Sequence, residues 1–476
     1  MKRYIIAIVT LVLASVSFSS CDKWLDINEN PNYPTSVDAR TLLPTVEMRL
    51  AEKVGYELNL VGSFWSQYVV QCSQTNQYYT VMTYNLPSSA SWFTAPWSVF
   101  YAQNLPAIKE IVTTYEKEDT YKNFVFEAKA LLAYHLYLLN SLYGDVCYSK
   151  SYCTPEYGTI NANSAPEFDS EKDIYNTILA LLEELRGMDQ EALAAADEIH
   201  PSSGYDVFFR GDLDSWLQFV NTLYLKELMR DFDTNKAKIT ALLAEDNFLS
   251  EDAAFDIYED AADKSNPLYE SDRRQLNTTQ NIRCCKDVVS LLSGSDGRVA
   301  KYYDKVAGEY LGTAYGTTAS RYSYARLHLA AKDPVYISTV EEAEFLKAEA
   351  FARLGNTPAA KAAYEEAVAA SFQRYGVNGA AALLEGDYAF DDSASVEEQV
   401  HQIIVQKWLG NVKGMPIESW FDINRTGYPV RGTDITKYGG DLGSPAVRFM
   451  YSYYSKNYND NAPEPLEMDV KMWWHK

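Results

Sequence analysis

The residue types that most often carry out chemistry are present in this chain, but not at the spacings that chemistry needs. The five histidines are scattered, and no H-E-x-x-H or cysteine–histidine spacing would gather a metal ion. The chain also has no G-x-G dinucleotide fingerprint, no G-K-S or G-K-T phosphate loop and no G-x-S-x-G nucleophile elbow. We therefore expect no metal and no cofactor, and we predict that the protein is not an enzyme.

Carboxylates leave one catalytic alternative open. Asp231-x-Asp233-x-Asn235 begins like a calcium loop, but Lys236 stands at the sixth place and Leu242 at the twelfth, where glycine and glutamate are needed. We therefore reject an EF-hand. A glycoside hydrolase needs only two carboxylates at a suitable separation, and a chain with 65 acidic residues neither supports nor excludes such a pair. Glycoside hydrolysis is kept as the less favoured alternative.

Aromatic residues are the more informative group, because 37 Tyr, 19 Phe and 9 Trp make up 14% of the chain. Aromatic rings pack against the apolar faces of sugar rings, while amides and carboxylates bind the hydroxyls. Most of these rings fall on apolar helix faces and are expected in the core. Three aromatic stretches lack helical periodicity, which is uncommon unless a long loop is functional. They are Asn76–Trp97, Tyr302–Tyr324 and Arg448–Tyr458.

The remaining sequence predicts helices that would position these stretches. Lys122–Tyr143 is apolar nearly all round and is expected to be a buried helix, in which His135 is a core residue. Ser170–Arg186 has one apolar face and a capping signal at its start. Asp214–Phe232 is expected to form another helix, with Trp216 facing inward.

A helical hairpin is predicted over residues 338–376. Ser338-x-x-Glu341 is a capping box, Gly355 ends the first helix, Thr357-Pro358 begins the second, and Gly376 ends it. The small and aromatic positions match part of the tetratricopeptide pattern. One such pair cannot bury its own apolar face, so further helices must pack on it.

One of these further helices is expected after a second capping box, Ser395-x-x-Glu398. We place Val396 and Trp408 on its core side.

The N-terminus predicts export and lipid anchoring. Residues 1–20 have a basic start and an apolar run of about 13 residues, too short to span a bilayer, followed at once by Cys21. We assign residues 1–20 to a signal peptide and 21–45 to the lipidated Cys21 and an extended lead segment, which is rich in Asn, Pro and Asp as far as Pro44. Residues 46–476 form the helical binding domain.

Charge and cysteine content exclude several partners. The formal net charge is −23 and no basic cluster is visible along the sequence, so nucleic acid and anionic lipid surfaces are unlikely partners. Five cysteines remain besides Cys21, an odd number that argues against a disulfide framework. We expect buried thiols, with a Cys147–Cys153 disulfide left open.

Several segments together resemble one family. Trp24–Asn28 and Asn30-Pro31-Asn32 are similar to the opening of mature SusD/RagB-type outer-membrane lipoproteins, and residues 127–146 are similar to that family's most recognisable helix and turn. Arg425-Thr426-Gly427-Tyr428-Pro429 and the closing Lys471-Met472-Trp473-Trp474 resemble its late signatures. The resemblance covers essentially the whole mature chain.

The resemblance implies an all-α, SusD-like fold with tetratricopeptide-like hairpins and a loop-rich ligand-binding half. It implies a surface-exposed outer-membrane lipoprotein that binds oligosaccharides, or peptides in some members, and delivers them to a SusC-like TonB-dependent transporter. The family's ligand site tends to lie in regions comparable to the first two aromatic stretches. We therefore predict these ligand-binding residues: Tyr79, Tyr84, Asn85, Trp92, Tyr315, Arg321 and Tyr322.

Overall fold

The computed structural model describes residues 37–72, 77–159, 161–275, 280–320, 322–431, 442, 444–464 and 466–476. One compact unit spans Ala39–Lys476. The predicted signal peptide, the lipidated Cys21, most of the lead segment and Arg321 lie outside the described residues. The end of the lead segment is helical rather than extended, because the first described helix begins at Ala39.

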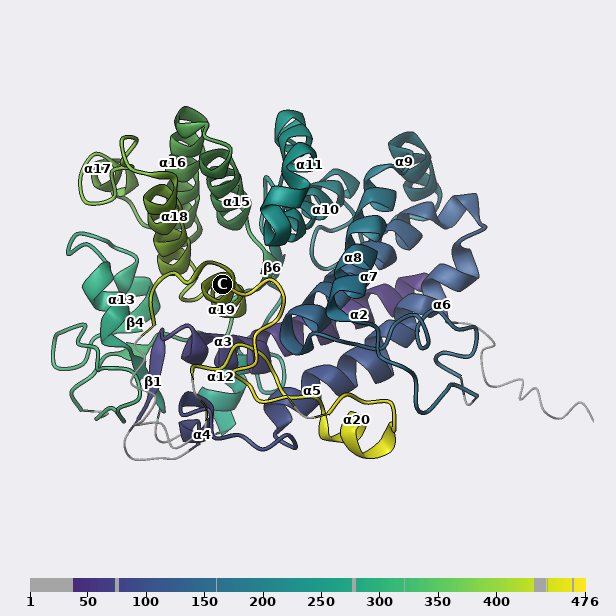
Figure 1. The fold of residues 1–476 in the computed structure, drawn as a ribbon, viewed down its shortest axis with the longest axis horizontal. Coiled ribbons are helices and arrows are strands. Elements are labelled where there is room, and N and C mark those ends of the chain that lie inside the picture. The colour runs from purple at the N-terminus through teal and green to yellow at the C-terminus, as the bar shows by residue number, and fades with distance from the viewer. Residues whose placement is uncertain are drawn as a thin grey trace, which may run out of the picture. The chain divides into compact units, whose positions relative to one another are not determined.

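Helices build most of the compact unit, and short strands lie between them (Figure 1). No helix in the described ranges is both long enough and apolar enough to cross a membrane. The helices are α2 (Ala39–Lys53), α3 (Asn59–Trp65), α4 (Tyr79–Met82), α5 (Ser91–Val99), α6 (Leu105–Tyr115), α7 (Lys122–Tyr143), α8 (Glu171–Arg186), α9 (Gln190–Ile199), α10 (Leu213–Leu228), α11 (Phe232–Glu245), α12 (Pro267–Tyr269), α13 (Lys286–Leu291), α14 (Val299–Tyr302), α15 (Val340–Arg353), α16 (Thr357–Arg374), α17 (Ala380–Leu384), α18 (Val396–Gly410), α19 (Pro416–Thr426) and α20 (Tyr453–Tyr458). The strands are β1 (Val69–Gln71), β2 (Ala253–Phe255), β3 (Ile282–Cys284), β4 (Tyr303–Asp304), β5 (Arg326–Leu327) and β6 (Val335–Ser338).

The buried helix α7 forms where the sequence predicts it. It runs from Lys122 to Tyr143 and ends at Gly144, whose φ of +83° suits glycine. His135 is fully buried, with Nδ1 2.7 Å from the Leu131 carbonyl oxygen and Nε2 3.0 Å from the Asn104 amide nitrogen. The prediction that it is a core residue is confirmed.

The neighbouring helices follow the sequence signals with one difference. Ser170 caps α8 by accepting the backbone N–H of Asp173, as predicted. The helix predicted over Asp214–Phe232 is shorter, because α10 ends at Leu228 and a 3₁₀ turn over Met229–Asp231 leads into α11. The apolar period continues through that turn, which hides the break from a sequence reading.

The predicted hairpin is α15 followed by α16, and α18 packs beside the pair (Figure 1). Ala348, Ala360 and Tyr364 are fully buried between these helices. The N-cap of α15 is Thr339 instead of Ser338: the Thr339 hydroxyl accepts the backbone N–H of Glu342. An adjacent hydroxyl thus takes the cap position that the sequence assigned to Ser338.

The second predicted capping box is confirmed at the start of α18, where Ser395 and Glu398 bond each other's backbone N–H groups. Trp408 is buried as expected, but Val396 is 45% exposed, so its assignment to the core side was wrong. Val396 is the first residue of the helix and lies beyond the packed surface.

Two small antiparallel sheets connect the helical parts. β1, β3, β5 and β4 form one sheet in that order, with Val69 opposite Cys284 and Arg283 opposite Arg326. β2 and β6 form the other. The first sheet therefore brings together segments that are more than 200 residues apart in the sequence.

Candidate functional site

Tyr84 and Tyr315, two of the predicted ligand-binding tyrosines, are core residues in this structure. Tyr84 is 2% exposed and its ring centroid lies 5.7 Å from that of Trp65. Tyr315 is 7% exposed and its hydroxyl donates to the Met82 carbonyl at 2.9 Å. A buried ring offers no face to a ligand, so their assignment to the ligand platform is corrected. The error arises because both loops fold back onto the sheet.

Four other predicted residues reach the surface to different extents. Tyr322 is 65% exposed, Tyr79 is 36% exposed, and Asn85 is also exposed. Trp92 is half-buried in α5, 5.6 Å from the Tyr56 ring. The expected loop over residues 76–97 is therefore partly helical, since α4 and the start of α5 lie within it.

The two predicted loops do come together, as the resemblance implies. Cys72, at the end of β1, forms a bridge to Ala319, and Cys285 forms one to Thr313. With the Tyr315–Met82 hydrogen bond, these contacts hold the segment from 313 to 319 against the segment that follows β1. This contact is made by buried groups, and the exposed tyrosines lie at its margins.

A more concave surface lies elsewhere, between α2 and the segment from 255 to 275. We call it the α2 groove. Its volume is about 550 Å³, within the range of small-ligand sites. Its lining residues are Met48, Glu52, Tyr56, Phe255, Ile257, Tyr258, Glu259, Asp263, Lys264, Ser265, Pro267, Glu270, Ser271 and Gln275.

Aromatic and apolar groups form one part of the groove lining. Ile257 is 57% exposed and Met48 is 46% exposed, an unusual degree of exposure for such side chains. The Phe255 and Tyr258 rings lie 4.8 Å apart, and the Tyr56 hydroxyl accepts a hydrogen bond from Ser271 at 3.0 Å. Burial raises the pKa of Tyr258, so its phenol is neutral. These rings provide flat apolar faces with hydroxyl groups at their edges.

Carboxylates form the other part of the groove lining. Glu52, Glu259, Asp263 and Glu270 face a single lining cation, Lys264. Glu259 pairs with Lys264 at 3.1 Å, and Glu270 accepts a hydrogen bond from Ser265. The groove therefore combines acceptors for hydroxyl groups with rings for apolar faces. The sequence reasoning did not identify it, although exposed apolar residues in the acidic, aperiodic stretch after residue 255 were a usable signal.

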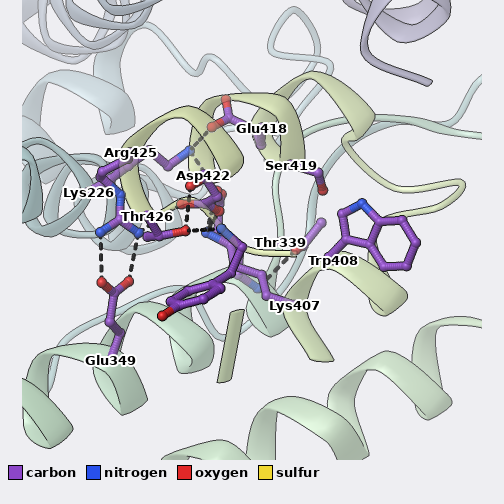
Figure 2. Close-up of polar contacts among 12 residues, drawn as sticks. Lys226, Thr339, Glu349, Lys407, Trp408, Glu418, Ser419, Asp422, Arg425 and Thr426 are labelled. Atoms are coloured by element: carbon purple, nitrogen blue, oxygen red, sulfur yellow. Dashed lines mark hydrogen bonds and ion pairs between the residues drawn. The ribbon is translucent and has the colours of Figure 1, made fainter. Parts of the chain in front are cut away.

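The densest polar cluster of the molecule lies in the scaffold (Figure 2). Lys226 of α10 pairs with Glu342 at 2.8 Å and with Glu418 at 3.2 Å, and Lys407 of α18 pairs with Asp422 at 2.7 Å. All these side chains are at least 88% buried. The paired charges join α10, α15, α18 and α19.

Arg425 extends this cluster to Glu349 of α15 through two parallel hydrogen bonds of 2.7 and 2.6 Å (Figure 2). Burial by itself would raise the pKa of Glu349, but Arg425 and Arg353 lower it to about 2. Both charges are thus fixed, which is typical of a structural ion pair. Arg425 therefore acts in helix packing, as the resemblance implies.

Groups suited to chemistry are not gathered elsewhere in the described ranges. No set of three His, Cys, Asp or Glu side chains among the described residues is placed to hold a metal ion. Cys72, Cys147, Cys284 and Cys285 are free, buried thiols, and Cys153 is free and exposed, so the Cys147–Cys153 disulfide is not formed.

Comparison with known proteins agrees with this arrangement. A sequence model of the SusD-like family described as "Starch-binding associating with outer membrane" matches residues 31–452. The chain belongs to this family. The comparison with curated proteins gives no match.

Solved structures share the fold along nearly the whole chain. A SusD homolog from Bacteroides uniformis ATCC 8492 has a TM-score of 0.75 and 22% identity, covering 91% of this chain and 99% of its own. A chitin-binding SusD homolog from Flavobacterium johnsoniae has a TM-score of 0.74 and 21% identity, covering 91% and 98%. A SusD-like protein from Bacteroides thetaiotaomicron VPI-5482 has a TM-score of 0.72 and 20% identity, covering 89% and 93%. The predicted all-α, SusD-like fold is confirmed.

Proposed function

We propose that this protein binds an oligosaccharide in the α2 groove and carries out no chemistry on it. The observation that carries the proposal is the combination of ring faces and carboxylates in one groove, in a chain of a starch-binding family. Tyr258 and Tyr56 pack against the apolar faces of sugar rings, while Glu52 and Glu270 accept hydroxyl hydrogen bonds.

The predicted loop residues form the second candidate location for the same ligand. Tyr322 and Tyr79 offer exposed rings and Asn85 an exposed amide, but no cavity is seen around them in the described residues. The groove is favoured because a concave site buries more of a ligand than isolated exposed rings do.

Delivery follows from export and anchoring. Cys21 holds the protein in the outer membrane through its lipid, on the cell surface, and a SusC-like TonB-dependent transporter receives the glycan. The family's association with the outer membrane supports this location. Deletion of the transporter gene beside this one is expected to abolish uptake of the glycan, and unchanged uptake would contradict delivery.

The binding site is tested by calorimetric titration with starch and chitin oligosaccharides. Tyr258→Ala is expected to weaken binding at least tenfold, because it removes a ring face from the groove. Tyr205→Ala is the matched control, since Tyr205 is 38% exposed and does not line the groove. A loss of binding in Tyr322→Ala with none in Tyr258→Ala would move the site to the predicted loops.

The alternatives predict different outcomes in the same assay. A peptide-binding member would take mixed peptides and ignore the sugars, with a preference for basic peptides given the four carboxylates of the groove. A glycoside hydrolase would release new reducing ends during the titration. Recovery of intact oligosaccharide after binding supports the proposal.

A further inference from the structure

A second cavity has the opposite charge to the α2 groove. It encloses about 240 Å³ beside the N-terminal end of β6 and the C-terminal end of α16. Its lining residues include Lys301, Arg374 and Lys413 but only one carboxylate, Asp333. In a chain with a net charge of −23 this is a local excess of cations. The three come from segments that are 39 or more residues apart, which is why no basic cluster is visible in the sequence.

Arg374 is the central group of this cavity. Its side chain is 5% exposed, and its Nη2 pairs with Glu341 and donates to the Gly410 carbonyl at 3.0 Å. Its Nε and Nη1 atoms are buried and have no hydrogen-bond partner among the described residues. Buried donors of this kind are rare in proteins and call for an acceptor. An anionic ligand group in the adjoining cavity supplies one.

The surroundings hold the guanidinium as a charged, flat donor. The Tyr336 and Tyr375 rings lie 5.4 and 5.0 Å from its central carbon. Burial alone would lower the pKa of Arg374, but the Glu341 carboxylate raises it above its usual value, so the group stays cationic. Tyr336 and Tyr375 also line the cavity and present ring surface to a ligand.

The two lysines differ in their availability. Lys413 is 13% exposed and pairs with Asp333 at 2.9 Å. Lys301 is exposed and makes no ion pair with any residue that the structure describes. One flexible lysine and one fixed guanidinium at the same cavity are typical of a site for a carboxylate or another oxyanion.

We propose that this cavity, lined by Lys301, Tyr336, Arg374, Tyr375 and Lys413, binds an acidic sugar through its carboxylate. A planar carboxylate matches the guanidinium, and the tyrosine rings contact the sugar ring. The volume lies below that of most drug-sized sites and suits one sugar unit. The cavity shares no lining residue with the α2 groove, so this inference goes beyond the proposed function.

The test compares methyl glucuronide with methyl glucoside, which differ only in the carboxylate. Calorimetric titration of the purified full-length protein in detergent is expected to give at least tenfold tighter binding of the glucuronide. Lys301→Gln is expected to weaken glucuronide binding at least fivefold without affecting folding, since Lys301 makes no ion pair with the described residues. Lys332→Gln is the matched control, because Lys332 is exposed and lies outside the cavity.

Three outcomes would overturn the proposal. Equal binding of the two glycosides would remove the role of the carboxylate. Equal loss of binding in Lys301→Gln and Lys332→Gln would indicate a general charge effect instead of this cavity. Sodium sulfate that binds as tightly as the glucuronide and displaces it would indicate a site for inorganic anions. Tyr258→Ala distinguishes the two proposals, since it is expected to leave glucuronide binding unchanged.

Discussion

The ion pair between Glu349 and Arg425 gives the sharpest prediction about the scaffold. Glu349 is 1% exposed and receives two hydrogen bonds from Arg425. Its pKa is lowered from 4.5 to about 2. A depressed carboxyl pKa stabilises the folded state at pH values above 4.5, and this stabilisation is lost as the pH falls towards 2.

The size of this contribution follows from the shift. A difference of about 2.5 pKa units corresponds to roughly 3 kcal/mol of unfolding free energy at pH 7. Breaking a buried ion pair by removing one partner typically costs about 3–5 kcal/mol, which is consistent. Glu349→Gln is therefore expected to lower the unfolding free energy by about 3 kcal/mol at pH 7. At pH 3 the loss is expected to fall to roughly 1 kcal/mol, because much of the wild-type contribution is already gone.

Urea unfolding followed by tryptophan fluorescence measures the effect at both pH values. Glu397→Gln is the matched control: Glu397 is 57% exposed and pairs with Lys476 at 2.8 Å, so its loss is expected to cost less than about 1 kcal/mol. Equal losses in the two variants, or a Glu349→Gln loss that is the same at pH 3 as at pH 7, would refute the reasoning. The urea slopes of wild type and variants must agree for the comparison to hold.

Two further predictions concern buried groups. Burial, the neighbouring Asp206 and Glu127 raise the pKa of Glu47 well above its usual value, so ionising Glu47 opposes folding as the pH rises above its unfolded pKa near 4.5. Glu47→Gln, which still accepts the Val207 N–H, is expected to lose less stability than wild type between pH 5 and 8; an identical pH profile would contradict this. Among the described thiols, only Cys153 is expected to react rapidly with Ellman's reagent in the folded protein, and Cys153→Ser is expected to remove that reaction. Persistence of the rapid phase in Cys153→Ser would place the reactive thiol elsewhere.

Local signals predicted the helices well. Lys122–Tyr143 and the caps at Ser170 and Ser395 depend on residues within one or two turns, and each is found where the sequence places it. The same locality explains the Ser338 error. Thr339 is also a good N-cap residue, and only its contact with the backbone of Glu342 decides between the two.

Burial of the loop tyrosines depends on contacts that the sequence does not display. Polar neighbours around Tyr84 and Tyr315 are equally consistent with an exposed loop and with a loop folded onto a sheet. The sheet decides, because β1 and β3 pair across more than 200 residues and bring Met82 within reach of the Tyr315 hydroxyl.

The two candidate ligand sites were invisible in the sequence for the same reason. The α2 groove needs Tyr56 and Tyr258 to meet across about 200 residues, and the cationic cavity needs Lys301, Arg374 and Lys413 to converge. A uniformly acidic composition predicts one kind of surface, yet folding separates the charges into a groove rich in carboxylates and a cavity rich in cations. A ligand carrying both neutral and acidic sugars would use both, so its affinity should fall in Tyr258→Ala and, independently, in Lys301→Gln.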